Sequence, residues 1–123
     1  MIKGIGTDII EIERINKAIK SNEMFLKKTF TNKELDQYNI DKLRVESIAG
    51  NFAAKEAVSK AIGTGFRGFT LRDIEIFRDN LGKPIVKVSK KIEDILGIKN
   101  YNFHISISHN RSTAIAYVIL EEI

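Results

Sequence analysis

Two acidic residues that lie far apart in the chain are the clearest candidates for chemistry. Asp8 stands in an alternating segment beside glycines, and Glu56 stands in an alanine-rich segment typical of a helix. Two hard oxygen ligands from separate elements suit Mg²⁺, which binds one or two carboxylates and completes its shell with water and phosphate oxygens. The pair predicts a metal site and a phosphate-containing substrate. The structural alternative is that Asp8 caps a turn and that Glu56 forms an i,i+4 surface ion pair with Lys60.

Further polar residues have side chains that bind phosphate. Lys60 follows Glu56 by one helical turn, which places both side chains on the same helix face. Its alternative role is that of a solvated surface lysine. His109 ends an alternating segment, and Asn110 and Arg111 follow it, so this strand end predicts an anion-binding cluster. The sequence has no G-x-S-x-G motif, and it therefore gives little support to a serine hydrolase.

The N-terminal half predicts one strand followed by helices. Alternation predicts a strand over Ile2–Ile10, in which the neighbouring glycines leave little side chain around the carboxylate of Asp8. From Glu11, apolar residues at helical spacing predict an amphipathic helix with a basic flank. Thr31 and Glu34 have the spacing of a capping box, which predicts the start of a short helix.

The remaining chain predicts one long helix and two hairpins. The longest helical pattern runs from about Lys42 to Ile62, and the glycine at position 63 ends it. Four strands and one short helix follow, over 71–78, 85–88, 89–96 (the helix), 103–108 and 113–120. Because the strands cluster instead of alternating singly with helices, we expect an α+β fold. It combines an N-terminal strand, helices and antiparallel hairpins around one long central helix, in a single domain over residues 1–123.

Composition excludes several classes of protein. The 20 Lys and Arg against 16 Asp and Glu leave a net charge of +4, which is too mild to indicate a nucleic-acid partner. The absence of cysteine excludes disulfide frameworks, thiolate zinc sites and cysteine nucleophiles. No apolar run reaches the roughly 20 residues of a membrane span. We therefore expect a cytoplasmic protein that binds neither nucleic acid nor membrane.

Three segments stand out together: GIGTDIIEIERI at residues 4–15, FAAKEAVSKAIGTG at 52–65 and HISISH at 104–109. With TNKELDQY at 31–38 and NLGKP at 80–84, they resemble the holo-[acyl-carrier-protein] synthase family of 4′-phosphopantetheinyl transferases in the same order. The resemblance covers essentially the whole chain. It implies that family's fold and the Mg²⁺-dependent transfer of 4′-phosphopantetheine from coenzyme A to a serine of apo-acyl carrier protein. The product is adenosine 3′,5′-bisphosphate, and the holo-carrier serves fatty-acid biosynthesis.

The resemblance also implies roles for individual residues. Asp8 and Glu56 bind the metal, and Lys60 lies near the pyrophosphate. The acceptor of the serine proton stays open between a metal-bound water relayed to Glu56 and His109, so the implied catalytic residues are Asp8, Glu56, Lys60 and His109. The residues implied to border coenzyme A are Lys60, Gly63, Thr64, Gly65, Pro84, His109 and Asn110.

The resemblance further implies the partners. The family is typically a homotrimer with active sites between subunits, and its carrier protein presents an acidic helix. The basic residues left to meet that helix are Arg14, Lys17, Lys20, Lys27 and Lys28. Lysines steer an acidic partner but lack the bidentate fork of arginine, so we expect a salt-sensitive association. Family members often carry a basic residue where this chain has Asn51, and Arg44, Arg67 or Arg111 is expected to supply that contact.

Two other functions compete with the transferase. A small basic nucleic-acid-binding module would use the same lysines and would be indifferent to Asp8 and Glu56. A metal-dependent phosphoesterase would use the acidic pair but would need no protein acceptor. Incubation of apo-carrier protein with coenzyme A and Mg²⁺ separates the three functions.

Overall fold

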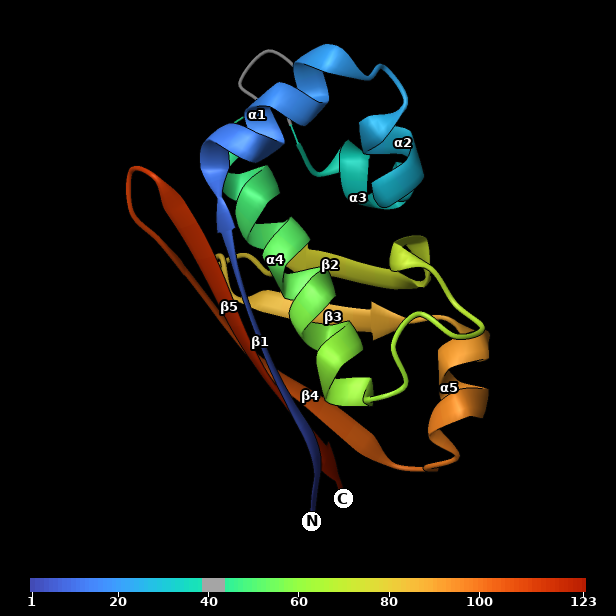
Figure 1. The fold of residues 1–123 in the computed structure, drawn as a ribbon. Helices are drawn as coiled ribbons and strands as arrows, with labels where there is room; N and C mark the ends of the chain where they lie inside the picture. The colour runs from blue at the N-terminus through green and yellow to red at the C-terminus, as the bar shows by residue number, and fades with distance from the viewer. Residues whose placement is uncertain (39–43) are drawn as a thin grey trace.

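The computed structural model describes residues 1–38 and 44–123. In chain order its elements are β1 (Ile2–Glu11), α1 (Ile12–Ser21), α2 (Phe25–Thr29), α3 (Asn32–Asp36), α4 (Val45–Ile62), the 3-10 helix η2 (Leu71–Asp73), β2 (Ile74–Arg78), β3 (Pro84–Val88), α5 (Lys90–Leu96), β4 (Tyr101–His109) and β5 (Thr113–Glu122). This is the predicted α+β fold, with α4 as the long central helix (Figure 1). Among the described residues, no helix is both long enough and apolar enough to cross a membrane.

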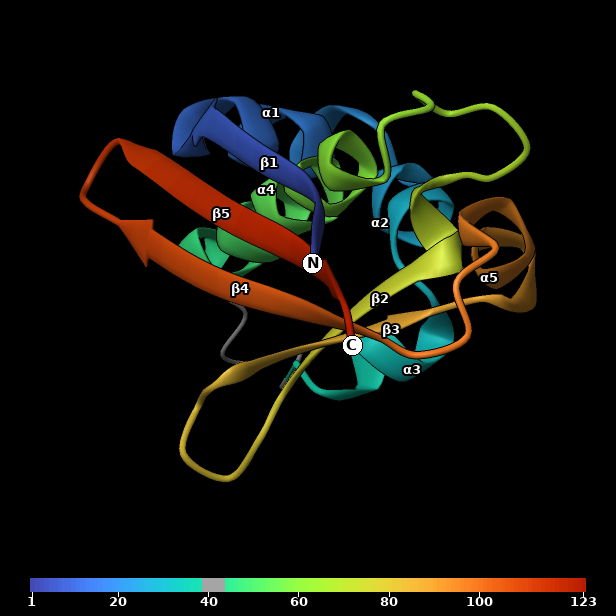
Figure 2. The same ribbon diagram turned by 90° about the horizontal axis from the view of Figure 1, so that it is seen from below.

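The strands form two antiparallel sheets. One has three strands in the order β1-β5-β4, and the other is the β2-β3 hairpin. The last strand therefore lies between the first strand and β4, and the two chain ends lie together (Figure 2). The amino group of Met1 donates a hydrogen bond to the carbonyl oxygen of Glu122 at 2.9 Å. The pairing of β1 with β5 brings Asp8 opposite Ala116, near the middle of the sheet.

Helix α4 packs directly onto β1, and two glycines make this approach possible. A Cβ atom added to Gly4 would lie 1.9 Å from the carbonyl oxygen of Ala61, and one added to Gly6 would lie 1.9 Å from that of Ala57. Any larger residue would push helix and strand apart. The glycines leave little side chain beside Asp8, as expected, and the backbone of α4 occupies the space next to them. Their effect is to bring the strand that carries Asp8 against the helix.

Apolar side chains from every layer pack around α4. One cluster joins the helix to the three-stranded sheet, to β2 and to α5 through Val58, Ile74, Ile76, Ile92 and Val118. A second cluster joins the N-terminal part of α4 to α1 and the short helices through Ile12, Ile15, Phe30, Ile48 and Ala114. Because α4 is covered on most sides, its position relative to the sheets is strongly constrained.

A buried ion pair also fixes α4. The Lys55 ammonium lies 2.5 Å from Glu34 Oε1, and neither side chain is exposed to solvent. The same ammonium donates to three backbone carbonyls, those of Thr29, Leu71 and Ile74. Burial raises the pKa of Glu34 and lowers the pKa of Lys55, while the contact between the two charges opposes both shifts. This pair ties the central helix to α2, α3, η2 and β2.

Most predicted elements are confirmed, with differences at their ends. The predicted start of the long helix at Lys42 lies outside the described residues. The capping box is present: Thr31 Oγ1 accepts a hydrogen bond from the Glu34 amide, and Glu34 Oε1 accepts one from the Thr31 amide. Two predictions failed. Helix α2 was not expected, and residues 71–73 form η2 instead of starting a strand, because Asp73 accepts a hydrogen bond from the amide of Thr70 and caps that turn.

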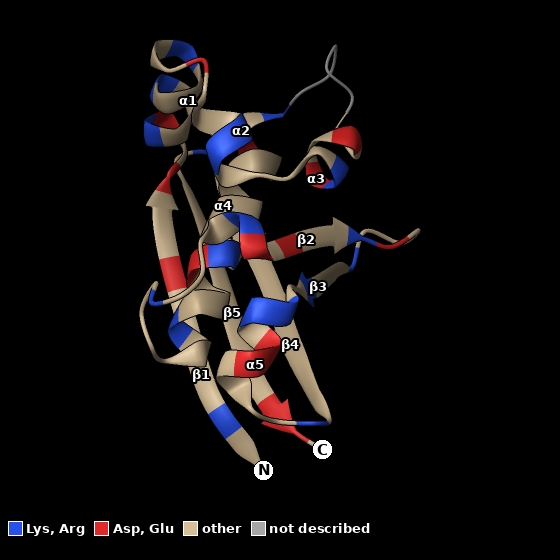
Figure 3. Ribbon diagram, turned by 90° about the vertical axis from the view of Figure 1, so that its right-hand side faces the viewer, with Lys and Arg blue, Asp and Glu red and all other residues tan. Residues whose placement is uncertain are grey.

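Positive charge is concentrated on α1 and α2 (Figure 3). The residues predicted to meet a carrier protein, Arg14, Lys17, Lys20 and Lys28, are all exposed on these two helices, and so is Lys27. None of the five takes part in an ion pair among the described residues. Their charges are therefore free to meet an acidic surface.

Candidate active site

The two candidate carboxylates meet where β1 crosses α4. Asp8 alternates with the exposed Ile9, so its side chain points to the face of β1 on which Gly4 and Gly6 contact the helix. Glu56 projects from α4 and is half-buried. Burial, and then the charge of Asp8, raise the pKa of Glu56 above its usual value, while Lys60 opposes the shift. The predicted pairing of these carboxylates is thus present in the fold, and their mutual repulsion favours a bound cation.

Lys60 completes this group, which we call the acidic pair with its lysine. Its ammonium lies 3.3 Å from Asp8 Oδ1 and donates a hydrogen bond to the carbonyl of Thr7 at 2.9 Å. The lysine side chain is 56% exposed, whereas that of Asp8 is 18% exposed. The structural alternative fails on both counts, because Asp8 lies inside a strand and Lys60 pairs with Asp8 instead of Glu56.

The acidic pair suits only a metal that relies on other ligands. Among the described residues, no group of three or more His, Cys, Asp or Glu side chains gathers into a metal site. Two carboxylates do not complete the coordination of zinc or calcium, but they are sufficient for Mg²⁺ when substrate phosphate and water supply the remaining oxygens. The donor set therefore fits the predicted Mg²⁺.

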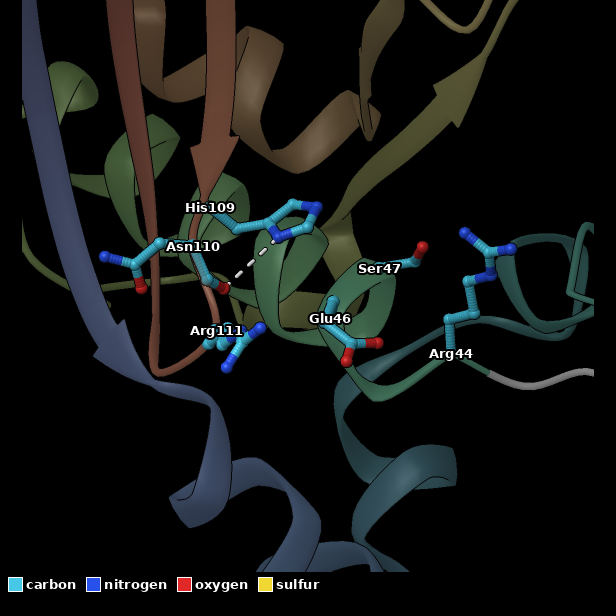
Figure 4. A pocket seen from close by; sticks show the side chains of 6 residues that line it. All are labelled: Arg44, Glu46, Ser47, His109, Asn110 and Arg111. Atoms are coloured by element: carbon cyan, nitrogen blue, oxygen red, sulfur yellow. Dashed lines mark hydrogen bonds between the residues drawn. The ribbon is translucent and has the colours of Figure 1, made fainter.

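His109 lies in a second, basic region. A cavity of about 430 Å³ is lined by Arg44, Glu46, Ser47, His109, Asn110 and Arg111 (Figure 4). A neighbouring cavity of about 550 Å³ shares Glu46, Ser47 and His109 with it. The imidazole Nδ1 lies 3.4 Å from the carbonyl oxygen of Asn110. The other ring nitrogen is left for a ligand, and we call this region the basic cavity.

Asn110 has a structural role in the turn after β4. Its side-chain oxygen accepts hydrogen bonds from the amide and hydroxyl of Ser112 and from the amide and hydroxyl of Thr113. These bonds close the β4-β5 turn and hold His109 at the strand end. The predicted contact between Asn110 and coenzyme A stays a prediction.

The structure shows which arginine lies beside Asn51. The buried side chain of Asn51 accepts a hydrogen bond from Arg78 Nη2 at 3.0 Å and donates one to the hydroxyl of Tyr38. Arg78 ends β2 and is 27 positions from Asn51 in the chain, so no local pattern indicates the contact. Sequence analysis missed Arg78.

The three arginines that sequence analysis named lie elsewhere. Arg44 and Arg111 line the smaller part of the basic cavity with His109. Arg67 is exposed in the segment after α4 and lines neither part of that cavity. In the part of the chain that the structure describes, none of these three arginines forms a hydrogen bond with Asn51, and their contact with the nucleotide stays a prediction.

Within one chain, α4 separates the acidic pair from the basic cavity. Ser47 and Glu56 are nine positions apart, and at about 100° per residue this places them on opposite sides of the helix. Gly63 and Thr64 lie at the far end, roughly 24 Å along the axis from Ser47. Gly63 ends the helix in the left-handed conformation, and Thr64 lines a separate cavity near Leu120. The predicted site residues therefore gather in separate places.

Pro84 lies closer to the basic cavity than Gly63 and Thr64 do. It pairs with Arg78 in the β2-β3 hairpin, and Gly82 in the same hairpin lines the larger part of the cavity. Proline is tolerated there because it is the first residue of its strand. Its proposed contact with the nucleotide has not been tested.

Comparison with known proteins decides the family. Residues 4–118 match the model of the 4′-phosphopantetheinyl transferase superfamily. The chain belongs to this superfamily. It is 59% identical over 123 residues to a holo-[acyl-carrier-protein] synthase of Clostridium botulinum (strain Eklund 17B), and the match covers 100% of both chains.

Solved structures of other superfamily members have the same fold. A holo-(acyl-carrier-protein) synthase from Bacillus anthracis, in complex with CoA (3′,5′-ADP), is 39% identical with a TM-score of 0.82, and the match covers 100% of this chain and 99% of that chain. The Helicobacter pylori holo-[acyl-carrier-protein] synthase in complex with coenzyme A is 36% identical with a TM-score of 0.83. The match covers 95% of this chain and 99% of that chain. The predicted fold and family are thus confirmed.

Proposed function

We propose that this transferase is a holo-[acyl-carrier-protein] synthase that moves 4′-phosphopantetheine from coenzyme A to a serine of apo-acyl carrier protein. Full-length identity to proteins of that name and the fold shared with coenzyme A complexes support the activity. The observation that carries the mechanism is the convergence of Asp8, Glu56 and Lys60 where β1 crosses α4. The holo-carrier serves fatty-acid biosynthesis.

The reaction breaks a phosphoanhydride bond and forms a phosphodiester. The serine Oγ of the carrier forms a bond to the phosphorus of phosphopantetheine, the pyrophosphate bond breaks, and adenosine 3′,5′-bisphosphate leaves with the bridging oxygen. Asp8 and Glu56 would hold Mg²⁺, which neutralises charge on the diphosphate when bound. Lys60 adds a positive charge beside Asp8, which suits the developing charge of the leaving group.

Our choice for the route of the serine proton is a water that passes it on to Glu56. Burial and the charge of Asp8 raise the pKa of Glu56, which favours proton uptake, while a bound cation would act in the opposite direction. His109 of the same chain lies across α4 from this group. It remains the alternative only if a neighbouring subunit brings its own His109 to the acidic pair.

A homotrimer with shared sites is part of the proposal. Because α4 separates the two regions within one chain, a neighbouring subunit is the simplest source of a basic cavity beside the acidic pair. The outer face of the three-stranded sheet supports such an assembly, since it exposes Ile5, Ile9, Ile115 and Tyr117. The number three comes from the family resemblance.

The proposal also includes the carrier-binding surface, the single domain and the cytoplasmic location. The exposed basic residues of α1 and α2 would meet an acidic helix of the carrier. Residues 1–123 would fold as one domain, which the apolar clusters on both sides of α4 support. The cytoplasmic location stays a prediction that cell fractionation would test.

Mass spectrometry of the carrier protein tests the reaction. Apo-carrier incubated with coenzyme A, Mg²⁺ and this protein should gain the mass of phosphopantetheine on its serine, and a carrier whose serine is replaced by alanine should not. Turnover of coenzyme A at the same rate without any carrier would instead indicate a phosphoesterase and would overturn the proposal.

Subunit mixing tests the shared site. Asp8→Ala and His109→Ala variants, each of low activity, are unfolded, mixed and refolded together. If each site combines an acidic pair from one subunit with a basic cavity from its neighbour, the mixture recovers part of the wild-type activity. If the mixture is no more active than the average of the two variants, the sharing is wrong.

A further inference from the structure

Arg78 carries a positive charge that the fold holds in place without neutralising it. Its Nη1 donates a hydrogen bond to the carbonyl of Gly82 at 3.1 Å, and its Nη2 donates one to Asn51 Oδ1 at 3.0 Å. Both acceptors are uncharged. Among the described residues, no carboxylate forms an ion pair with this guanidinium. At least three of its five N–H groups are left for another acceptor.

Asn51 fixes the direction of the guanidinium. The asparagine is 1% exposed, and its amide nitrogen donates to the hydroxyl of Tyr38, so its oxygen must face Arg78. Tyr38 keeps its proton, because burial raises its pKa to about 12. The chain of contacts from Tyr38 through Asn51 to Arg78 orients the arginine before any ligand binds, which lowers the entropy that binding must cost.

The fixed guanidinium borders the larger part of the basic cavity. Arg78 lines this space of about 550 Å³ together with Asn51, Ser47 and His109. The imidazole there has one nitrogen engaged by a carbonyl and one free. The planar set of guanidinium N–H donors matches the oxygens of a phosphate group, whereas it offers nothing to a cation or to an apolar group.

We propose that Arg78 binds a phosphate monoester of the substrate and that Asn51 positions it. The inference rests on the proposed function, because coenzyme A carries one phosphate monoester, on its ribose, besides the diphosphate that reacts. A monoester has a charge near −2 at neutral pH and is repelled by carboxylates. It therefore belongs in the basic cavity, where Arg44, Arg78 and Arg111 outnumber the one carboxylate, Glu46, while the diphosphate meets the acidic pair. Arg78 thereby becomes a determinant of specificity for coenzyme A over its dephosphorylated form.

Equilibrium binding of two nucleotides tests the proposal on the assembled protein. Adenosine 3′,5′-bisphosphate and adenosine 5′-monophosphate differ only in the ribose 3′-phosphate, and titration calorimetry measures both without any carrier. Arg78→Ala should weaken the binding of the bisphosphate roughly 10- to 100-fold and should leave the affinity for the monophosphate within about twofold of wild type. The affinity of Arg78→Lys for the bisphosphate should lie between those of wild type and Arg78→Ala, because lysine keeps the charge but lacks the paired N–H donors of the guanidinium.

A matched control and a kinetic readout sharpen the test. Arg72→Ala removes another exposed arginine, one that lines neither part of the basic cavity, and should bind both nucleotides like wild type. In turnover, Arg78→Ala should raise the KM for coenzyme A with kcat retained and leave the KM for dephospho-coenzyme A unchanged. Size-exclusion chromatography and thermal unfolding check that each variant is folded and assembled.

The possible results separate this inference from the proposed function. Equal weakening of both nucleotides, or no weakening of either, overturns the role of Arg78 even if the enzyme modifies its carrier normally. Lower carrier affinity with unchanged nucleotide binding would assign Arg78 to the protein partner and would also overturn the proposal. If the wild-type protein modifies no carrier but its binding of the bisphosphate still depends on Arg78, the proposed function fails and the phosphate site stands.

Discussion

Two lysines of α4, five positions apart, have opposite environments. Lys55 is fully buried, and its ammonium contacts Glu34 and three backbone carbonyls. Lys60 is 56% exposed and contacts Asp8 at 3.3 Å and one carbonyl. The buried ammonium has no room for a further ligand, whereas the exposed one can exchange its contacts for those of a substrate.

The comparison separates stability from chemistry along a single helix. An ion pair with every group satisfied in the interior fixes α4 and is costly to break. An ion pair at the surface contributes little to stability and rearranges easily. Lys55 therefore holds the helix that carries Glu56, and Lys60 serves the site itself. The predictions below test this division.

Replacing the buried lysine should have the largest effect on folding. Lys55→Met leaves the Glu34 carboxylate and three carbonyls without their donor, so we expect the free energy of unfolding to fall by about 3–5 kcal/mol. Urea denaturation measures it. Lys55→Met combined with Glu34→Leu should recover part of the loss, since the uncompensated charge is then removed. A loss below about 1 kcal/mol in the single variant would contradict the structural role.

Replacing either member of the acidic pair should have the largest effect on activity. Asp8→Asn and Glu56→Gln keep the shape of the side chain but lose the charge that would hold the metal. We expect kcat/KM for carrier modification to fall about 100-fold or more. Asp94→Asn, an exposed carboxylate on α5, is the control and should be fully active. A folded Glu56→Gln variant of normal activity would remove Glu56 from the mechanism.

The pH dependence of activity should report on Glu56. The pKa of Glu56 lies above the ordinary 4.5, and the ionised form is needed. Activity should therefore decrease as pH is lowered, with a midpoint above 4.5. Mg²⁺ favours the ionised carboxylate, so higher Mg²⁺ should move the midpoint to lower pH. A midpoint that ignores Mg²⁺ would contradict the assignment.

The same shift has a consequence for stability. The raised pKa means that the folded state binds the Glu56 proton more tightly than the unfolded state does. The contribution of Glu56 to the free energy of unfolding therefore decreases as pH rises from 4.5 through the raised pKa. Glu56→Gln should remove this part of the pH dependence, which denaturation of both proteins over that range would measure.

Replacing the exposed lysine should have the smallest effect on folding. Lys60→Met should change the free energy of unfolding by less than about 1 kcal/mol, because its partner is reached through solvent-exposed atoms. Turnover should nevertheless slow, since a charge beside the leaving group is lost. Equal losses of stability in Lys60→Met and Lys55→Met would abolish the distinction between the two lysines.

Local patterns were enough to predict most of the elements. Alternation identified β1 and both hairpins, and apolar spacing identified α1 and α4. The capping box at Thr31 was recognised because both of its partners lie within one turn. The grouping of Asp8, Glu56 and Lys60 was predictable in part, because the spacing within α4 places the last two on one face.

Contacts between distant segments were not predictable from such patterns. The partners of Lys55 lie 16 to 26 positions away, so the sequence shows only a lysine in an alanine-rich helix. The close packing at Gly4 was not predicted, because only the packed fold brings the Ala61 carbonyl against it. Arg78 was missed for the same reason.

The position of a divalent cation tests the central claim most directly. A crystal grown with coenzyme A and Mn²⁺ in place of Mg²⁺ reveals the cation by its anomalous scattering. We predict one cation bound to Asp8 and Glu56 and to oxygens of the diphosphate. A structure with coenzyme A bound, but with no cation between these two carboxylates, would contradict the account.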